Sequence, residues 1–363
     1  MTKINTKKIA VFGSLTIDLF VQPSESQVIT MTTENLEKTL FALPHGGKIS
    51  AEHIQEHFGG GASNVGVSFS RLGNEVFAFG GIGNDNNGKK ILEHLEEEKI
   101  SGTFVQAFEN IKSGFSLILN AFDGERTVIF TSEANQKFNT INSPLSLGEG
   151  LGVRDNFDAI YLCHLSGKNP EKIFSEIQKF LEKTQKKLFW NPGRERITLG
   201  LENPINKNLL KNCDILFVNT EEAEEFSGIS AKKQKSHGQE LREKHHVTKQ
   251  HTEISIPDYV RDVSEIAEKF LESGVTMVVI TDGRKGAQAF SQTTSEYLFI
   301  PCVSSTRVDT LGAGDSFASA FSHFYMQGET LQKCGEYASI NAASVVSYRG
   351  AQDGLLTKTQ ILR

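Results

Sequence analysis

Short apolar runs alternate along this chain with segments whose apolar residues recur every three or four positions. The segment 170–185 shows the second pattern, with Ile173, Ile177 and Leu181 on one face of a helix. The segment 264–273 repeats this spacing. The short runs predict buried strands at residues 9–13, 76–80, 159–163, 188–190, 215–218 and 277–280. This alternation predicts an α/β fold with a doubly wound, mostly parallel sheet flanked by helices.

Two apolar runs, at 115–122 and 126–130, interrupt the alternation. They flank Asp123-Gly124, a dipeptide that favours a tight hairpin because both central positions accept positive φ. With residues 17–21, this hairpin predicts a small β-sheet that covers the main sheet as a lid. We expect the lid to comprise about residues 14–58 and 113–131 of a single domain that spans 1–363.

Two polar segments predict surface insertions. Residues 139–156 are rich in Ser, Gly, Asn and Pro, and residues 231–251 are rich in Lys, Gln, Glu and His. Neither offers enough apolar surface to pack against a core. The histidines of the second segment lack a defined scaffold, so a solvated loop is expected there rather than a metal site.

Composition and charge narrow the classes of protein. A formal net charge of −6 gives no electrostatic reason to expect a nucleic-acid partner. No apolar stretch approaches the roughly 18 residues of a membrane helix, and Asp18 interrupts the apolar run 9–21 as a secretory leader would not. The four cysteines form no CxxC pair, so neither a zinc knuckle nor a dithiol centre is expected. We therefore expect a cytoplasmic protein that binds neither membrane nor nucleic acid.

The segment 309–315 reads D-T-L-G-A-G-D and precedes apolar residues at helical spacing. A glycine-rich turn at a helix N-terminus suits an anion, because the main-chain N–H groups of Gly312, Ala313 and Gly314 can face a phosphoryl group. Asp315, in the first turn, is kept ionised by the helix dipole and could accept a hydroxyl proton. A tight turn with a capping Asp explains the same residues, and the segment alone does not separate the two interpretations.

This segment resembles the C-terminal signature D-T-x-G-A-G-D-x-F of the ribokinase-like (PfkB) family of carbohydrate kinases, which residues 309–317 match throughout. The resemblance implies that Asp315 is the catalytic base and that Gly312, Ala313 and Gly314 form the anion hole. It also implies a kinase that moves the γ-phosphate of ATP onto a hydroxyl group.

A second signature, G-G-G-A-S-N at 59–64, is similar to the G-G-x-x-x-N pattern of the same family. It implies that Gly60, Gly61 and Asn64 hold substrate hydroxyls, and Asp18 resembles the N-terminal Asp that binds sugar in this family. Glycines admit a polyol close to the backbone, and a carboxamide both donates and accepts. By itself, a glycine-rich helix start is explained equally well by helix packing. Gly61 stands where ribokinases proper usually have Lys, which leaves ribose specificity open.

Further segments resemble the family's nucleotide and cation sites. Residues 219–222 resemble N-x-x-E, which is associated with Mg²⁺ through water, although an acidic helix start gives the same pattern. Residues 281–286 resemble the turn T-x-G-x-x-G. The nucleotide-binding residues implied are Asn219, Glu222, Thr281, Gly283, Gly286 and Asn341. Glu222 would contact Mg²⁺ via water, and a possible K⁺ would lie at Asp309, Leu311 and Gly350.

Asp18 with Asn64 favours a small sugar as the acceptor, since two polar groups suit several hydroxyls. A nucleoside acceptor is the alternative, which an aromatic lid residue would favour by stacking on a base; the candidates are Phe20, Phe41, Phe115 and Phe122. A non-catalytic sugar- or nucleotide-binding protein is a further alternative, against which Asp315 argues. The lid of many relatives also makes dimer contacts, so a homodimer is expected by analogy.

Overall fold

We describe a computed structural model of the chain, in which residues 6–33, 36–121, 126–139, 157–167, 170–235, 254–255, 259–293 and 296–363 are placed. Within these residues the main sheet has nine strands, and all pairs are parallel except those of the two last strands at one edge. Their order across the sheet is β18 (Glu296–Ile300), β17 (Ala287–Ser291), β16 (Met277–Thr281), β12 (Ile215–Asn219), β11 (Lys187–Trp190), β10 (Ala159–Leu162), β1 (Lys8–Phe12), β6 (Glu75–Gly83) and β7 (Ile100–Phe108). The predicted doubly wound, mostly parallel sheet is confirmed.

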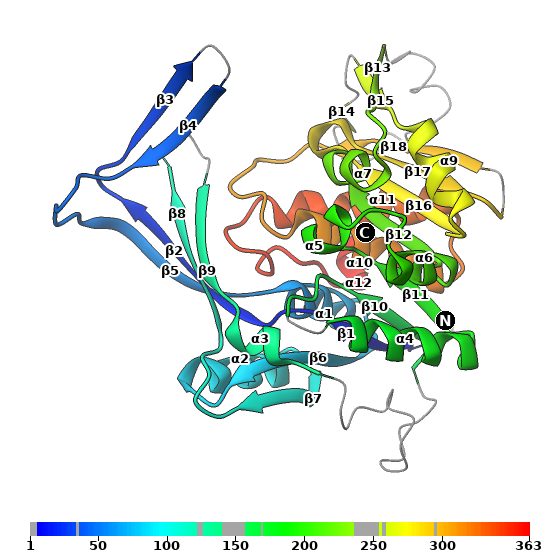
Figure 1. The fold of residues 1–363 in the computed structure, drawn as a ribbon, viewed down its shortest axis with the longest axis horizontal. Helices are drawn as coiled ribbons and strands as arrows, with labels where there is room; N and C mark the ends of the chain where they lie inside the picture. Colours follow the sequence, from blue (N-terminus) through cyan, green and yellow to red (C-terminus); the bar gives the residue numbers. More distant parts are fainter. Residues whose placement is uncertain are drawn as a thin grey trace.

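Alternate side chains of the central strands enter two separate cores, one on each face of the sheet. On β1, Ile9 and Val11 belong to one core, whereas Ala10 and Phe12 belong to the other. The first core is completed by α1 (Gly61–Arg71), α2 (Asn86–Glu97), α10 (Ala313–Met326) and α11 (Leu331–Val345). The second is completed by α4 (Pro170–Thr184), α6 (Pro204–Lys211), α7 (Thr220–Ser227) and α9 (Ser264–Glu272). Helices on both faces explain why the strands are apolar throughout (Figure 1).

The chain changes direction across the sheet between β1 and β10. From β1 it proceeds outward through β6 and β7, and it then returns to β10, on the other side of β1, before continuing to β11, β12 and β16. Ligands of open α/β sheets bind at the carboxyl ends of the strands beside such a switch point. The residues that follow β1 and β10 are therefore placed at the expected site.

A second sheet projects from one side of the molecule (Figure 1). Its strand order is β5 (Ala51–Gly59), β2 (Thr16–Pro23), β8 (Gly114–Asn120) and β9 (Arg126–Thr131). The predicted turn at 123–124 lies outside the described residues, but β8 and β9 pair antiparallel with Asn120 opposite Arg126. A hairpin of β3 (Gln27–Thr33) and β4 (Leu36–Ala42), which the sequence pattern did not predict, lies beyond this sheet. The smaller sheet, which we call the lid, confirms the predicted fold class.

Short elements connect these layers. They are α3 (Glu133–Lys137), α5 (Arg194–Thr198), α12 (Lys358–Ile361), the 3₁₀ helix η1 (Gly283–Lys285), and the strand pairs β13 (Lys232–Lys235) with β15 (Tyr259–Asp262) and β14 (Ile254–Ser255) with β19 (Cys302–Val303). Residues 232–235 of the second expected insertion thus form a strand, while most of both insertions lies outside the described residues. Of the helices in the described ranges, none has the length and apolar character needed to cross a membrane.

Candidate active site

The two signature segments meet at the N-termini of α1 and α10. Asn64 Nδ2, in the first turn of α1, donates a hydrogen bond to Asp315 Oδ2, in the first turn of α10, at 2.9 Å. Further along the pair, the buried hydroxyls of Ser68 and Ser319 are 2.7 Å apart and hold the helices together. Residues separated by 251 positions in the sequence therefore form one polar site.

Asp315 lies half-buried at this junction. Burial raises the pKa of its carboxyl above the ordinary value, while the hydrogen bond from Asn64 acts in the opposite direction. Burial thus opposes the helix dipole, which was the only influence that the sequence predicted for this carboxylate. A raised pKa makes the carboxylate a stronger base, which suits proton abstraction.

The turn before α10 is shaped by glycine. Gly312 has φ of 75°, and a Cβ at this position would lie 2.5 Å from the Cβ of Ala351. Gly314 is exposed, and a Cβ there would meet nothing within 4 Å. No side chain caps α10, but the N–H of Ala313 donates to the carbonyl of Thr310 at 3.4 Å. An anion bound at this helix end would compete with that long hydrogen bond for the N–H of Ala313.

A cavity of about 310 Å³ opens in front of this helix end. Its polar wall includes four of the residues predicted to bind nucleotide, which are Asn219, Thr281, Gly283 and Gly286. Ala313 and Gly314 line it from α10, and its other walls are mostly apolar, with Val303, Phe317, Ala342, Ala343 and Val346. The cavity therefore joins an apolar recess to a row of main-chain donors.

Asn341 does not line this cavity, contrary to its predicted place in the nucleotide site. It is fully buried, and its Nδ2 donates to the carbonyl of Ser316 at 3.0 Å. Its Oδ1 accepts from the N–H of Leu356 at 3.0 Å. Its amide therefore joins α10 to the C-terminal segment, and its neighbours Ala342 and Ala343 face the cavity instead.

Asn219 and Glu222 form a capping box at the start of α7. Asn219 Oδ1 accepts from the N–H of Glu222 at 2.8 Å, and Glu222 Oε2 accepts from the N–H of Asn219 at 2.9 Å. These contacts are those expected of an acidic helix start. Burial, followed by the negative charges of Glu221, Asp315 and Glu225, raises the pKa of Glu222. A carboxylate in such surroundings would be stabilised by a nearby cation.

The turn 281–286 lies at the edge of the same cavity. Thr281 pairs with Asn219 across β12 and β16, which places the two predicted segments side by side. Gly286 has φ of 89°, and a Cβ there would lie 2.2 Å from the carbonyl oxygen of Ile300. The close approach of the neighbouring chain explains this glycine.

Asp18 lies on β2 and is buried against the start of α1. A Cβ on Gly59 would lie 2.0 Å from Asp18 Oδ2, so this position requires glycine. Gly60 has φ of 89°, and a Cβ on Gly61 would lie 2.8 Å from the Cβ of Cys163. Burial raises the pKa of Asp18, and hydrogen bonds from Ser116 and Thr16 oppose this effect. Asp18, Gly60 and Gly61, which were predicted to bind the acceptor substrate, thus lie where main-chain and side-chain atoms pack closely.

Two further lid residues, His57 and Arg126, were not among the predicted site residues. His57 pairs with Asp18 across β5 and β2, and its buried Nε2 has no hydrogen-bond partner among the described residues. Arg126 Nη1, at the start of β9, lies 2.9 Å from Asp309 Oδ1 and 3.1 Å from Thr310 Oγ1. Both residues could have been identified from the sequence as polar positions on the inner face of a predicted lid strand.

The residues predicted to hold K⁺ are close together, but their contacts are hydrogen bonds to one another. Asp309 Oδ1 accepts from the N–H of Leu311 at 3.0 Å, and Oδ2 accepts from the N–H of Gly350 at 3.2 Å. The guanidinium of Arg126 supplies the remaining positive partner. A cation bound to Asp309 would have to compete with Arg126.

The arrangement of the two sheets and the site defines a ribokinase-type fold. Arabidopsis thaliana ribokinase complexed with ribose and ATP has this fold, with a TM-score of 0.74, 22% identity and 98% of each chain covered. The nucleoside kinase of Methanocaldococcus jannaschii aligns with a TM-score of 0.69 and 19% identity, covering 98% of this chain and 97% of that one. In sequence, Arabidopsis thaliana ribokinase is 23% identical over 357 residues, which is 98% of this chain and 80% of the relative.

Residues 6–358 match the pfkB family of carbohydrate kinases, and the chain belongs to this family. It is a kinase of that class, as its two signature segments implied. The match covers both sheets and the helix pair α1 and α10.

Proposed function

We propose that this kinase transfers the γ-phosphate of ATP to a hydroxyl of a small sugar. One observation carries the proposal: the hydrogen bond between Asn64 and Asp315 at the N-terminus of α10, where the preceding residues Ala313 and Gly314 line an open cavity. This arrangement brings a base, a hydroxyl-binding amide and main-chain donors together, as phosphoryl transfer requires.

In the proposed reaction the acceptor hydroxyl lies between Asp315 and the γ-phosphorus. Its oxygen forms a bond to that phosphorus while the bond from phosphorus to the β–γ bridging oxygen breaks. Asp315 takes the hydroxyl proton, and the products are the sugar phosphate and ADP. The N–H groups of Gly312, Ala313 and Gly314 stabilise negative charge on the transferred group.

The nucleotide is proposed to occupy the cavity at Ala313 and Gly314, with its base against the apolar wall and its phosphates at the helix end. The chemistry of Glu222 fits a magnesium ion, which is held mainly by substrate phosphates and water and neutralises phosphate charge. In the described ranges no group of three or more His, Cys, Asp or Glu side chains could hold a metal by itself. Glu222 would therefore contact the ion through water.

A monovalent cation at Asp309 fits the arrangement less well. The carboxylate already accepts from Leu311, Gly350 and Arg126. We propose that the guanidinium supplies the positive charge beside the anion-hole turn, and no step is assigned to K⁺.

The acceptor is proposed to bind between Asn64 and the inner face of the lid. Asp18 offers an acceptor to hydroxyl groups, and Nε2 of His57, which has no hydrogen-bond partner within the described ranges, offers a further polar atom. Two aromatic candidates for stacking on a nucleoside base are engaged elsewhere: Phe20 is buried edge-on against His57, and Phe115 packs against the main core. Of the other two candidates, Phe41 on β4 is half-buried and Phe122 lies outside the described residues. The proposal of a sugar therefore rests on Asp18 and Asn64.

A screen of ATP consumption against ribose, fructose, other small sugars and adenosine tests the acceptor class. We expect turnover with at least one sugar and formation of its phosphate ester, detected by mass spectrometry. Faster turnover with adenosine would favour the nucleoside alternative. Consumption with none of them, despite measurable ATP binding, would favour a binding protein.

A further inference from the structure

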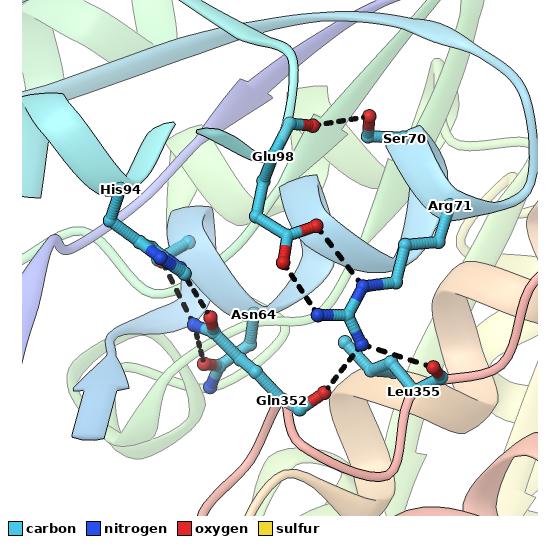
Figure 2. Close-up of polar contacts among 8 residues, drawn as sticks. Asn64, Ser70, Arg71, His94, Glu98, Gln352 and Leu355 are labelled. Carbon is cyan, nitrogen blue, oxygen red and sulfur yellow. Dashed lines mark hydrogen bonds and ion pairs between the residues drawn. The ribbon is translucent and has the colours of Figure 1, made fainter. Parts of the chain in front are cut away.

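The side chain of Gln352 links the candidate site to α2. Gln352 is 4% exposed, and its Nε2 donates to Ser63 Oγ and to Asn64 Oδ1, each at 2.9 Å. Its Oε1 lies 2.7 Å from His94 Nε2. Figure 2 shows this amide between Asn64 and His94. Because Asn64 in turn contacts Asp315, a continuous chain of hydrogen bonds runs from His94 to the carboxylate of Asp315.

The chain has only one consistent direction. An ionised carboxylate only accepts, so Asn64 must present its NH₂ group to Asp315 and its oxygen to Gln352. Gln352 must then present its NH₂ group to Asn64 and its oxygen to His94, which donates from Nε2. Reversing either amide would place two acceptors or two donors against each other. Gln352 therefore favours the orientation of the Asn64 amide in which its NH₂ group faces Asp315.

The backbone that carries Gln352 is held independently of its side chain. Arg71 Nη1 donates to the carbonyls of Gln352 at 2.9 Å and of Leu355 at 3.1 Å, and the guanidinium also pairs with Glu98 (Figure 2). His94 is held by stacking on Phe58, with ring centroids 3.9 Å apart. A side-chain substitution at 352 therefore leaves these supports in place.

The same segment supports the rest of the site. The N–H of Gly350 donates to Asp309, and Ala351 lies directly against Gly312 of the anion-hole turn. The next residue, Gln352, donates a hydrogen bond to Asn64. Three consecutive residues thus contact three parts of the proposed phosphoryl-transfer site.

We propose that Gln352 is a positioning residue that fixes Asn64 so that Asp315 is kept in its proton-accepting form. This inference rests on the proposed function, in which Asp315 is the base. His94 is the distal end of the chain, since either its neutral or its protonated ring can donate from Nε2.

Other titratable groups around Asp315 do not replace this role. Glu222 of α7 adds negative charge, and burial raises the pKa values of Tyr161 on β10 and of Cys163 after it well above their ordinary values, which keeps both neutral. At the distal end, His94 lies near Asp353, which is also close to His57 and Arg71. Asn64 is the neighbour whose contact favours the ionised form of Asp315.

The substitution Gln352→Glu keeps the size of the side chain but removes its NH₂ donor. Once the introduced carboxyl group is ionised, the Asn64 amide is expected to reverse and to present its oxygen to Asp315. The pKa of Asp315 should then rise, and the acidic limb of the kcat profile should move by about one pH unit to higher pH. At neutral pH kcat should fall at least about tenfold, as for loss of a hydrogen bond to a charged group, with the KM for ATP little changed.

Two further variants separate charge from positioning. Gln352→Met lacks both the donor and the charge. Its kcat should fall, and the acidic limb of its kcat profile should move less than that of Gln352→Glu. Gln332→Glu adds the same charge at an exposed position of α11 and should leave the profile unchanged. Thermal unfolding of all variants reports whether the fold is intact.

The titration of Asp315 is also measured without substrate, by carbon NMR of the carboxyl group, with Asp315→Asn identifying the signal. A higher pKa in Gln352→Glu supports the inference even if the parent protein phosphorylates no tested sugar, an outcome that would count only against the proposed function. An active parent whose Gln352→Glu variant keeps the parental carboxyl pKa and pH profile would overturn the inference.

Discussion

At the scale of the residue, the proposed chemistry depends on the carboxylate of Asp315, whose ionisation is opposed by some of its neighbours and favoured by others. Burial of Asp315 favours its neutral form, whereas Asn64 and the helix N-terminus favour its charged form. A carboxylate held in this way is a stronger base than a solvated one. It also destabilises the folded chain when it is ionised.

Asp315→Asn should therefore affect activity and stability in opposite directions. Loss of the base is expected to lower kcat by about 10²- to 10⁴-fold while ATP binding, measured by calorimetry, is retained. Because the folded-state pKa of Asp315 is raised, its cost to stability is present above that pKa and disappears as the pH falls through it and the unfolded-state value. The variant should have a higher Tm than the parent at neutral pH, and the gain should shrink at acidic pH. Near-normal turnover would show that another group is the base.

Gly314 is open to the cavity, whereas Gly312 is confined by Ala351. In Gly314→Ala the new methyl group would point into free space at the helix end, so stability should hold or rise by up to about 1 kcal/mol. The same methyl group would obstruct the phosphate, and kcat/KM for ATP should fall at least about tenfold. Gly312→Ala is the contrasting variant and should lower Tm because of its positive φ. Unchanged ATP kinetics in Gly314→Ala would place the phosphates elsewhere.

At the scale of the element, the lid reaches the main domain through Arg126. Its contacts with Asp309 and Thr310 join β9 to the turn that precedes α10. The ion pair is largely buried, since Asp309 is 8% exposed in its side chain, so solvent weakens it less than a surface pair. The position of the lid is thereby linked to the charge beside the proposed anion hole.

Arg126→Met removes this charge while retaining an apolar stem. We expect kcat to fall at least about fivefold, a coupling of ordinary size between linked elements. K⁺ should partly restore the variant, because Asp309 is then free to bind a cation, whereas the parent should respond little to K⁺. The test compares kcat of the parent and of Arg126→Met in potassium salts with kcat in tetramethylammonium salts. Arg126→Lys is a control that keeps the positive charge. A parent protein that needs K⁺ for turnover would refute the proposed role of Arg126.

At the scale of the whole molecule, the lid leaves apolar side chains in solvent. Ile54, Ile129 and Phe130 are 62%, 57% and 70% exposed on β5 and β9, which are the two edge strands of the lid. Exposed edges of this kind pair readily with another chain. They support the proposal of a homodimer through the lid.

Light scattering after size-exclusion chromatography tests the dimer. We expect the parent protein to have the mass of two chains at micromolar concentration and Phe130→Glu to have the mass of one. Tyr297→Glu, which replaces an exposed aromatic residue on β18 of the main sheet, is a matched control and should remain dimeric. A monomeric parent would count against the proposal.

The sequence determined the elements and the local shape of the two signature segments. Apolar runs such as 9–13 specified buried strands, because a strand covered on both faces must be apolar throughout. The positions of Gly60 and Gly312 specified turns that other residues adopt poorly. The strands β3 and β4 were missed because they lack the continuous apolar run by which the buried strands were predicted, and Ile29 and Met31 on β3 are exposed.

The tertiary structure decided which distant residues meet. Asn64, Asp315 and Gln352 lie on separate segments, and their hydrogen bonds exist only because α1, α10 and the C-terminal segment pack together. It likewise placed Asn341 in the interior rather than in the cavity and brought Arg126 to Asp309. Local sequence sets backbone preferences over a few residues, whereas burial, charge and hydrogen-bond partners depend on neighbours that only packing supplies.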